Sequence, residues 1–397
     1  MIRHLPELPD DVLERLRGRA ARWDAENAFP HDDLDDLRRL GWLRLSVPAE
    51  RGGADLGLRD VAALQSRLAE AAPATALAVG MHLVWTGVAR LLHERGDDSL
   101  ALVLDDAARD ELFAFGVSEP GNDTVLLDST TTAEPAGDGA WRFTGTKTST
   151  SLSPAWTRLG VFGRDDSDPA APLLVHGFVH RDQPGHVSLG DWDTVGMRAT
   201  QSHSTRLEGV VVPAGRIVRR LPVGAGDDAL PAAVLTVFST LVPAVYRGIA
   251  RRALALAVEA ATTRTSRRAG GRPLAEDPVV RWRLADAAIV LDGLEAQLDA
   301  FAGEVDAGTD HGADAARLAV GLRTRVVEGA QQVVDRAVAV AGGAAYRSGS
   351  ELARLQRDVQ AGRFHPASSD AAHATVAAAL LGTGPGGADE DAPPARP

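Results

Sequence analysis

Apolar residues recur at helical spacing through the first hundred positions of the chain. Between positions 13 and 43 they follow one another at three- and four-residue intervals, as a surface helix requires. The residues in this pattern are Leu13, Leu16, Ala20, Trp23, Leu37, Leu40 and Leu43. A stretch rich in glycine and proline, 47–57, interrupts the pattern, which resumes over 58–89. The pattern predicts an N-terminal helical domain over residues 1–110.

The rhythm changes in the middle of the chain. Short runs of residues typical of strands alternate there with Gly, Asp and Pro, which favour turns; the runs are 141–144, 159–162, 173–179 and 204–212. Short strands at this spacing are typical of a small all-β unit. We therefore expect a central antiparallel β-barrel domain over residues 111–222.

Helical patterns return after residue 228, now long and rich in alanine. Asp277 and Pro278 form a strong helix start, with an N-cap carboxylate and a proline at the first helical position. A further helix, 313–340, ends at two glycines. Long helices joined by short loops predict a C-terminal four-helix bundle over 228–383. The low-complexity residues 384–397 are expected to form a disordered tail. The fold class is thus α+β, with a β-barrel between two helical domains.

Composition narrows the classes of function. The 397 residues are 45% hydrophobic and 24% charged, with a formal net charge of −12, which argues against nucleic acid as a partner. The absence of cysteine excludes disulfides and thiolate chemistry. The N-terminus has no apolar signal region, and no uninterrupted run of 18 apolar residues predicts a membrane span. We therefore expect a cytoplasmic protein. Lys147 is the only lysine, a bias that we interpret as codon usage.

General sequence motifs leave the function open. The chain has no phosphate-binding P-loop, no glycine-rich dinucleotide fingerprint after a strand and no Gly-x-Ser-x-Gly turn. His176 and His180 share one face of a predicted strand, but no third ligand accompanies them. Two ordinary sheet histidines are therefore favoured over a zinc site, and we predict no metal.

Five local sequences together resemble the acyl-CoA dehydrogenase superfamily of flavoproteins over nearly the full length. They follow in the order that the family has, on elements of the expected type. In chain order they are LRRLGWLRLSVPAERGGADLG, FGVSEPGND, FTGTKTSTS, DWDTVGMRATQS and AGGAAYRSGSELARLQRDVQAGRF. The resemblance implies a flavin cofactor and redox chemistry on a small organic substrate.

The resemblance assigns two stretches to the flavin. In the first stretch, the residues that match the family's hydrogen-bonding positions at the pyrimidine edge are Phe115, Val117 and Ser118. Hydrogen bonds there would stabilise negative charge on the reduced ring. The second stretch consists of Ser149, Thr150 and Ser151. Family enzymes often carry tryptophan where this chain has Ser149, so we expect a wider or more polar pocket over the flavin.

Three further residues match the family's contacts to the far end of FAD. Arg267 matches an arginine that reaches the diphosphate of a neighbouring subunit's cofactor, a task suited to its planar fork of donors. The family's usual phenylalanine in that motif is Gly270 here. Gly342 and Gly343 match a loop that approaches the adenine, although a helix end would also favour glycine there. The resemblance implies FAD, with FMN as the alternative, and a homotetramer or homodimer.

The catalytic base of an acyl-CoA dehydrogenase is missing. Such an enzyme needs a carboxylate to remove the α-proton of its substrate. The position that matches the family's usual glutamate is Pro366, and the alternative position is Phe238. Neither side chain can accept a proton. Asp370 is close in sequence, but it would need a different loop path to reach the same point.

The C-terminal third instead resembles the monooxygenase branch, which includes dibenzothiophene monooxygenase. In that branch a histidine takes part in proton transfer during the reaction of the reduced flavin with oxygen, and His365 matches it. Thr150 and Ser151 would add hydroxyls near the reactive edge, and His82 could line the same pocket. A buried helix histidine is the alternative interpretation of His82, and a loop histidine before proline is that of His365.

Three hypotheses follow. The first is a monooxygenase that receives reduced flavin from a flavin reductase and acts on a small aromatic or amine-bearing substrate. The second is an acyl-thioester dehydrogenase with an unorthodox base such as Asp370. The third is a catalytically silent relative that binds a ligand or a partner.

Overall fold

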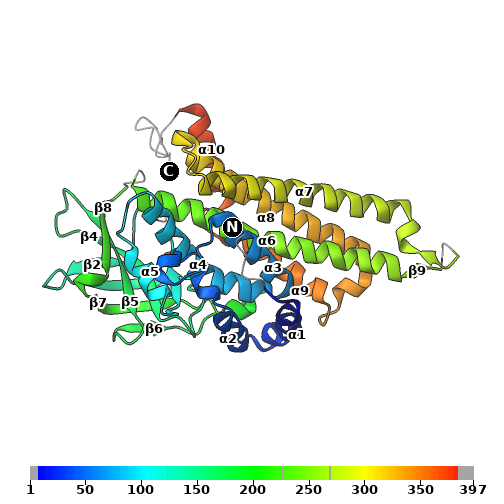
Figure 1. Cartoon of the computed structure of the whole chain (residues 1–397), viewed down its shortest axis with the longest axis horizontal. Coiled ribbons are helices and arrows are strands. Elements are labelled where there is room, and N and C mark those ends of the chain that lie inside the picture. Colours follow the sequence, from blue (N-terminus) through cyan, green and yellow to red (C-terminus); the bar gives the residue numbers. More distant parts are fainter. Residues whose placement is uncertain (1–7, 123, 125, 225–227, 268–269, 383–397) are drawn as a thin grey trace, which may run out of the picture.

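The computed structural model describes residues 8–382 except 123, 125, 225–227 and 268–269. Helices, a sheet and a second set of helices follow one another along the chain (Figure 1). The sheet lies at one end of the long axis, and the longest helices extend from it toward the other end (Figure 1). The predicted disordered tail, 384–397, lies outside the described residues.

The N-terminal helices surround one almost fully buried helix, α4. In chain order the elements are α1 (Asp10–Glu26), α2 (His31–Arg39), the short 3-10 turns η1 (Trp42–Arg44) and η2 (Ala49–Arg51), α3 (Leu58–Ala71), α4 (Pro73–Glu94) and α5 (Ala101–Ala107). By length and composition α4 and α6 (Ala229–Thr263) could each cross a membrane. However, 94% of the most apolar 18-residue segment of α4 and 78% of that of α6 are buried inside the fold. Burial of this kind is expected of core helices.

The central sheet is mixed and open, which corrects the prediction of an antiparallel barrel. Its strands are β1 (Phe113–Gly116), β2 (Thr132–Pro135), β3 (Trp141–Lys147), β4 (Arg158–Asp165), β5 (Leu173–His180), β6 (His186–Ser188), β7 (Thr205–Val212) and β8 (Ile217–Pro222). The order is β6-β7-β3-β2-β4-β5-β8, and β1 pairs with β4 in parallel, as does β2. An antiparallel hairpin needs a tight turn, but the long stretch 117–131 follows β1 instead. The end strands β6 and β8 do not pair with each other.

The C-terminal helices begin where the sequence predicts. Their elements are α6, the hairpin β9 (Thr265–Ser266) and β10 (Arg272–Pro273), η5 (Leu274–Glu276), α7 (Pro278–Asp306), η6 (Gly312–Asp314), α8 (Ala315–Ala341), η7 (Gly342–Tyr346), α9 (Glu351–Asp358), η8 (Val359–Phe364) and α10 (Ser369–Leu381). The Asp277 carboxylate accepts hydrogen bonds from Val279 N and Val280 N at the start of α7. This N-cap confirms the predicted helix start.

The two helical segments share one core, because α6 packs directly on α3 and α4. Arg247 of α6 is buried and donates to the Ser66 hydroxyl of α3 at 2.8 Å. A Cβ on the next residue, Gly248, would lie 2.3 Å from the Ser66 carbonyl oxygen. Only glycine permits this close approach of the two helices. The core therefore fixes where α6 passes the sheet, and with it the position of the site.

Candidate active site

Aromatic rings from four elements meet beside the first strand of the sheet. Phe115 of β1 stacks on Phe238 of α6, with ring centroids 5.8 Å apart and an interplanar angle of 25°. The ring of Trp85 of α4 also packs on Phe115, with ring centroids 5.1 Å apart. The imidazole of His365, which follows η8, meets Phe238 at 6.2 Å in an edge-on arrangement. We call these four rings the aromatic row.

Two helices hold the loop that carries His365. The Tyr246 hydroxyl of α6 lies 2.6 Å from His365 Nε2. Arg323 of α8 donates to the His365 carbonyl oxygen at 2.9 Å and to the carbonyl oxygen of Ala367. Both Tyr246 and Arg323 are buried. The histidine is thus fixed through its ring and through its backbone.

The surroundings keep His365 neutral. Burial lowers its pKa to about 4, and the positive charge of Arg323 acts in the same direction. At neutral pH the imidazole therefore has one protonated and one free nitrogen. A neutral imidazole in this state can donate one hydrogen bond and accept another, which suits proton transfer.

The aromatic row contains no carboxylate where a dehydrogenase base is required. Phe238 stands within the row, and Pro366 follows His365 directly. Asp370 lies in the first turn of α10 with its side chain exposed. The described residues show no hydrogen bond or ion pair between Asp370 and the row. The geometry therefore gives no support to Asp370 as an unorthodox base.

The two predicted flavin-contacting stretches lie side by side. Thr148 N donates to the Ser118 carbonyl oxygen at 2.8 Å, which joins the stretch after β1 to the stretch after β3. Val117 is buried, Ser118 is half-buried, and Ser149 is exposed with a φ of 54°. The structure thus joins the two predicted stretches by a backbone hydrogen bond, and Phe115 of the first stretch is itself part of the aromatic row.

A buried hydroxyl without a partner in the stretch after β3 fits a contact to a flavin. Thr150 is fully buried, and its hydroxyl has no hydrogen-bond partner among the described residues. A buried hydroxyl without a partner is costly unless a ligand or a water satisfies it. Ser151, in contrast, is paired with the Ser202 hydroxyl at 2.8 Å. Thr150 is therefore the better candidate for a direct contact to the polar edge of a flavin, and Ser151 supports the loop.

A buried ion pair between Glu119 and Lys147, which the sequence analysis did not predict, joins the two stretches. Lys147 Nζ is 2.5 Å from Glu119 Oε1, and neither side chain has any exposure. Lys147 also donates to the Phe162 carbonyl oxygen, and Glu119 accepts from the backbone of Thr130. Burial lowers the pKa of Lys147 to about 8, whereas Lys147 outweighs burial at Glu119 and lowers its pKa to about 2. The one sequence feature that could have pointed to this pair is that Lys147 is the only lysine in the chain.

His82 has a different place from the predicted one. Its Nε2 lies 2.7 Å from the Leu43 carbonyl oxygen, and its Nδ1 accepts from Phe113 N at 3.1 Å. Burial lowers its pKa to about 4. Because the backbone engages both ring nitrogens, neither is left for a substrate. His82 joins α4 to η1 and β1, and the geometry does not support a catalytic role.

The residues predicted for the far end of FAD lie apart from the aromatic row. Arg267 is exposed and directly follows β9, which lies at the opposite end of the molecule from the sheet (Figure 1). Gly342 and Gly343 are exposed at the end of α8, and Arg264 donates to the neighbouring carbonyl oxygen of Ala341. The hairpin and the glycine loop are therefore close together. A hollow of about 200 Å³ between the end of α6 and η7 lies in the same region.

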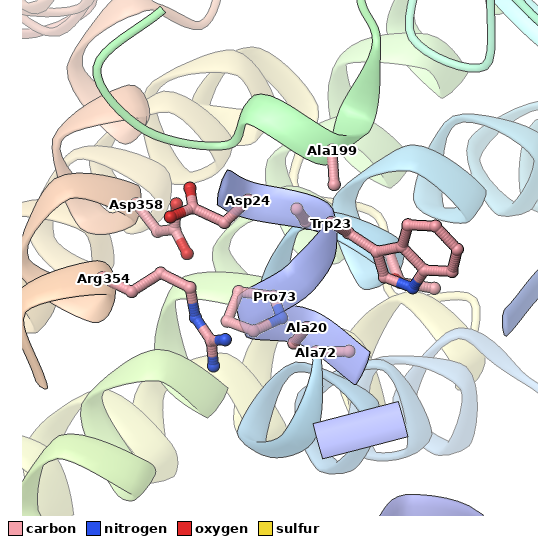
Figure 2. Close-up of a pocket in the computed structure, with 10 residues that line it drawn as sticks. Ala20, Trp23, Asp24, Ala72, Pro73, Ala199, Arg354 and Asp358 are labelled. Carbon is pink, nitrogen blue, oxygen red and sulfur yellow. The ribbon is translucent and has the colours of Figure 1, made fainter. Parts of the chain in front are cut away.

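A second buried cluster joins two of the five segments that resemble the family, the one that contains Met197 and the one that contains Arg357 and Asp358. Asp358 accepts from Met197 N at 2.6 Å, and Arg357 donates to the Asp24 carboxylate at 2.5 Å. Figure 2 shows Asp24, Asp358 and Arg354 around a cavity of about 10 Å³, which has room for about one water molecule. Burial raises the pKa of Asp358 to about 6, and the Asp24 carboxylate adds to this effect.

This raised pKa predicts a pH-dependent stability. The folded protein binds the Asp358 proton more tightly than the unfolded chain, so this contribution is present at about pH 4 and is lost as the pH rises through 6. Asp358→Asn keeps an oxygen acceptor for Met197 without the charge. Relative to wild type, the variant should gain of the order of 3 kcal/mol in unfolding free energy between about pH 4 and pH 7 in urea titrations. Asp370→Asn is the exposed control, and parallel pH curves for wild type and Asp358→Asn would contradict the prediction.

Comparisons with known proteins match this architecture. Residues 10–99 match the family model for the acyl-CoA dehydrogenase N-terminal domain, and residues 241–370 match that for the C-terminal domain. L-evernosamine nitrososynthase from a Micromonospora strain is 32% identical over 91% of this chain and 86% of its own length. Amino sugar nitrososynthase RubN8 from Streptomyces rubradiris is 33% identical over 90% and 84%.

A solved structure extends the likeness to three dimensions. The crystal structure of KijD3 in complex with FMN and dTDP-3-amino-2,3,6-trideoxy-4-keto-3-methyl-D-glucose has a TM-score of 0.85 and 32% identity, covering 94% of this chain and 92% of that one. The chain therefore belongs to the acyl-CoA dehydrogenase superfamily, as its five sequence motifs predict. The expectation of a flavin-dependent oxidoreductase is confirmed.

Proposed function

We propose that the protein is a flavin-dependent monooxygenase that inserts one oxygen atom of O₂ into a small substrate. The observation that carries the proposal is the neutral imidazole of His365 at the end of the aromatic row, where a dehydrogenase would need a carboxylate. Phe238 and Pro366 occupy the two positions of that carboxylate. The dehydrogenases of this family remove the α-proton with a carboxylate, and neither position holds one here. The neutral imidazole can instead donate one hydrogen bond and accept another.

We propose a primary amine, carried on a sugar, as the substrate. Two relatives at 32–33% identity are nitrososynthases, and one of them is named for amino sugars. The KijD3 structure contains an amino sugar linked to dTDP. When bound, the reduced flavin supplies two electrons, so that R–NH₂, O₂ and the reduced flavin give R–NHOH, water and oxidised flavin. The amine is converted to a hydroxylamine in this first oxidation.

We assign flavin binding, exclusion of water and proton exchange to different residues of this chain. Ser118 and Thr150 bind the polar edge of the flavin, and the Lys147–Glu119 pair holds their two stretches together. Trp85, Phe115 and Phe238 form an apolar wall that excludes water from the reacting atoms. His365 holds a proton next to this wall and exchanges it with the substrate side.

The test is turnover with reduced flavin. Protein, a flavin reductase, NADH, O₂ and a panel of dTDP-amino sugars should give a product heavier by one oxygen atom than the substrate. The dehydrogenase hypothesis predicts instead that acyl-CoA thioesters bleach the bound flavin without O₂. Colourless protein that binds neither FAD nor FMN would support the silent relative.

The remaining assignments are part of the same proposal. The exposed Arg267 hairpin and the Gly342–Gly343 loop favour FAD, with its adenine end reached by these residues from a neighbouring subunit of a homotetramer or homodimer. FMN is the alternative, and the mass of the extracted flavin decides between them. A flavin reductase is the proposed partner, and the cytoplasm is the proposed location.

A further inference from the structure

Tyr246 lies in the core of α6 with no exposed surface, yet its hydroxyl points at the active-site loop. The hydroxyl oxygen is 2.6 Å from His365 Nε2, a short distance for a neutral hydrogen bond. The two rings have centroids 5.7 Å apart at an angle of 60°. A buried phenol must place its proton on an acceptor, because leaving it unpaired is costly.

The direction of this hydrogen bond follows from the partners of the hydroxyl. Among the described residues, His365 Nε2 is the only hydrogen-bond partner of the Tyr246 hydroxyl. If Nε2–H donated to the tyrosine, the phenol proton would have no acceptor. Burial also raises the pKa of Tyr246 well above its usual value, so the hydroxyl keeps its proton. The hydroxyl therefore donates, and the free lone pair of the imidazole lies on Nε2.

We propose that Tyr246 is a positioning residue that fixes His365 in one tautomer, with the proton on Nδ1 and with Nδ1–H left for the flavin and substrate side. The imidazole then meets its ligands as a hydrogen-bond donor. Its role in the reaction rests on the proposed function, whereas the tautomer itself is a property of the resting protein.

Charged groups act on both side chains of the pair. The positive charge of Arg323 of α8 disfavours a second proton on the imidazole of His365. It also lowers the pKa of Tyr246, but burial outweighs this effect and the pKa stays raised. Asp358 of α9 acts on Tyr246 and disfavours loss of the phenol proton. Arg323 also binds the carbonyl oxygens of His365 and Ala367, so the loop is held while the ring direction is set by Tyr246.

Histidine nitrogen NMR tests the proposal without turnover. Long-range ¹H–¹⁵N spectra of the full-length protein labelled at its 11 histidines report which ring nitrogen carries the proton. The signal that His365→Asn removes belongs to His365. The expected spectrum has Nδ1 protonated and Nε2 bare. A protonated Nε2, or rapid exchange between the two forms, in the wild-type protein would overturn the proposal.

Tyr246→Phe removes only the hydroxyl. The variant should show a mixture of both tautomers and a rise of about one unit in the pKa of His365, because the lost donor had stabilised the neutral form. Tyr346→Phe is the matched control, since Tyr346 is the only other tyrosine and is 94% exposed. An unchanged tautomer and pKa in a folded Tyr246→Phe protein would also overturn the proposal.

Kinetics separate this proposal from the proposed function. If the protein is a monooxygenase, Tyr246→Phe should lower kcat by up to about tenfold with little change in KM, and it should shift the acidic limb of the pH profile upward. A fixed Nδ1–H tautomer in a protein without oxygenase activity would refute only the function. Oxygenase activity with a mixed wild-type tautomer would refute only the role of Tyr246.

Discussion

His365→Asn should reduce product formation by about 10²–10⁴-fold while the protein keeps its fold and its flavin. This range is what removal of a general acid–base group typically costs. Asparagine occupies a similar volume and retains a donor, but it cannot exchange a proton near neutral pH. The two stretches proposed to contact the flavin belong to β1 and to the loops after β1 and β3, so the substitution leaves their hydrogen bonds in place. Single-turnover rates with reduced flavin and the amine substrate measure the effect.

His373→Asn provides the matched control for this prediction. His373 lies in α10, a short distance further along the chain, with its side chain exposed and its Nδ1 bound to the Ser369 carbonyl oxygen. Its substitution should leave the rate unchanged. If His365→Asn turned over at the rate of His373→Asn, the imidazole at the end of the aromatic row would have no chemical role.

Lys147→Met should destabilise the fold by about 3–5 kcal/mol and abolish flavin binding, because it leaves the Glu119 charge buried without a partner. The pair joins the two stretches proposed to contact the flavin, because Glu119 directly follows Ser118 and Lys147 lies shortly before Thr150, so its loss should separate them. Urea unfolding measures the stability, and the flavin absorbance of the purified variant measures binding.

Two variants make the interpretation of Lys147→Met specific. The ion pair of Arg164 with Asp128 is partly exposed, so Arg164→Met should cost less than about 1 kcal/mol. The double variant Lys147→Met/Glu119→Gln removes both charges and should recover part of the lost stability. An unfolding midpoint for Lys147→Met equal to that of Arg164→Met would contradict the account.

Elements with a strong local signal could be predicted from the sequence. The helix start at Asp277 and Pro278 is confirmed because an N-cap carboxylate and a first-turn proline act within a few residues. The order of helices, strands and helices follows from the change of hydrophobic period. The parallel pairing of β1 with β4 could not be predicted in this way, since it depends on contacts between residues far apart in the chain.

In the candidate site, too, residues within local motifs could be predicted, whereas contacts between distant parts of the chain could not. The motifs predict Ser118, Thr150 and His365 as site residues, and their contacts with a flavin or a substrate stay predictions. In the structure Thr148 N donates to the Ser118 carbonyl oxygen, and His365 meets Phe238. The sequence contained no sign that backbone groups of two other elements engage both nitrogens of His82. The partner of Lys147 was equally hidden, because an ion pair depends on distance in space. Tyr246 had no motif, and only the fold places it against His365.

Isotope labelling of the product under ¹⁸O₂ tests the central claim most directly. The protein, reduced flavin and an amino sugar substrate are combined under ¹⁸O₂ in ordinary water, and the product is analysed by mass spectrometry. A monooxygenase predicts a hydroxylamine or a further oxidised product that carries ¹⁸O on the former amine nitrogen. Unlabelled substrate with every amine tested, together with anaerobic reduction of the bound flavin by an acyl-CoA thioester, would contradict the account and identify a dehydrogenase.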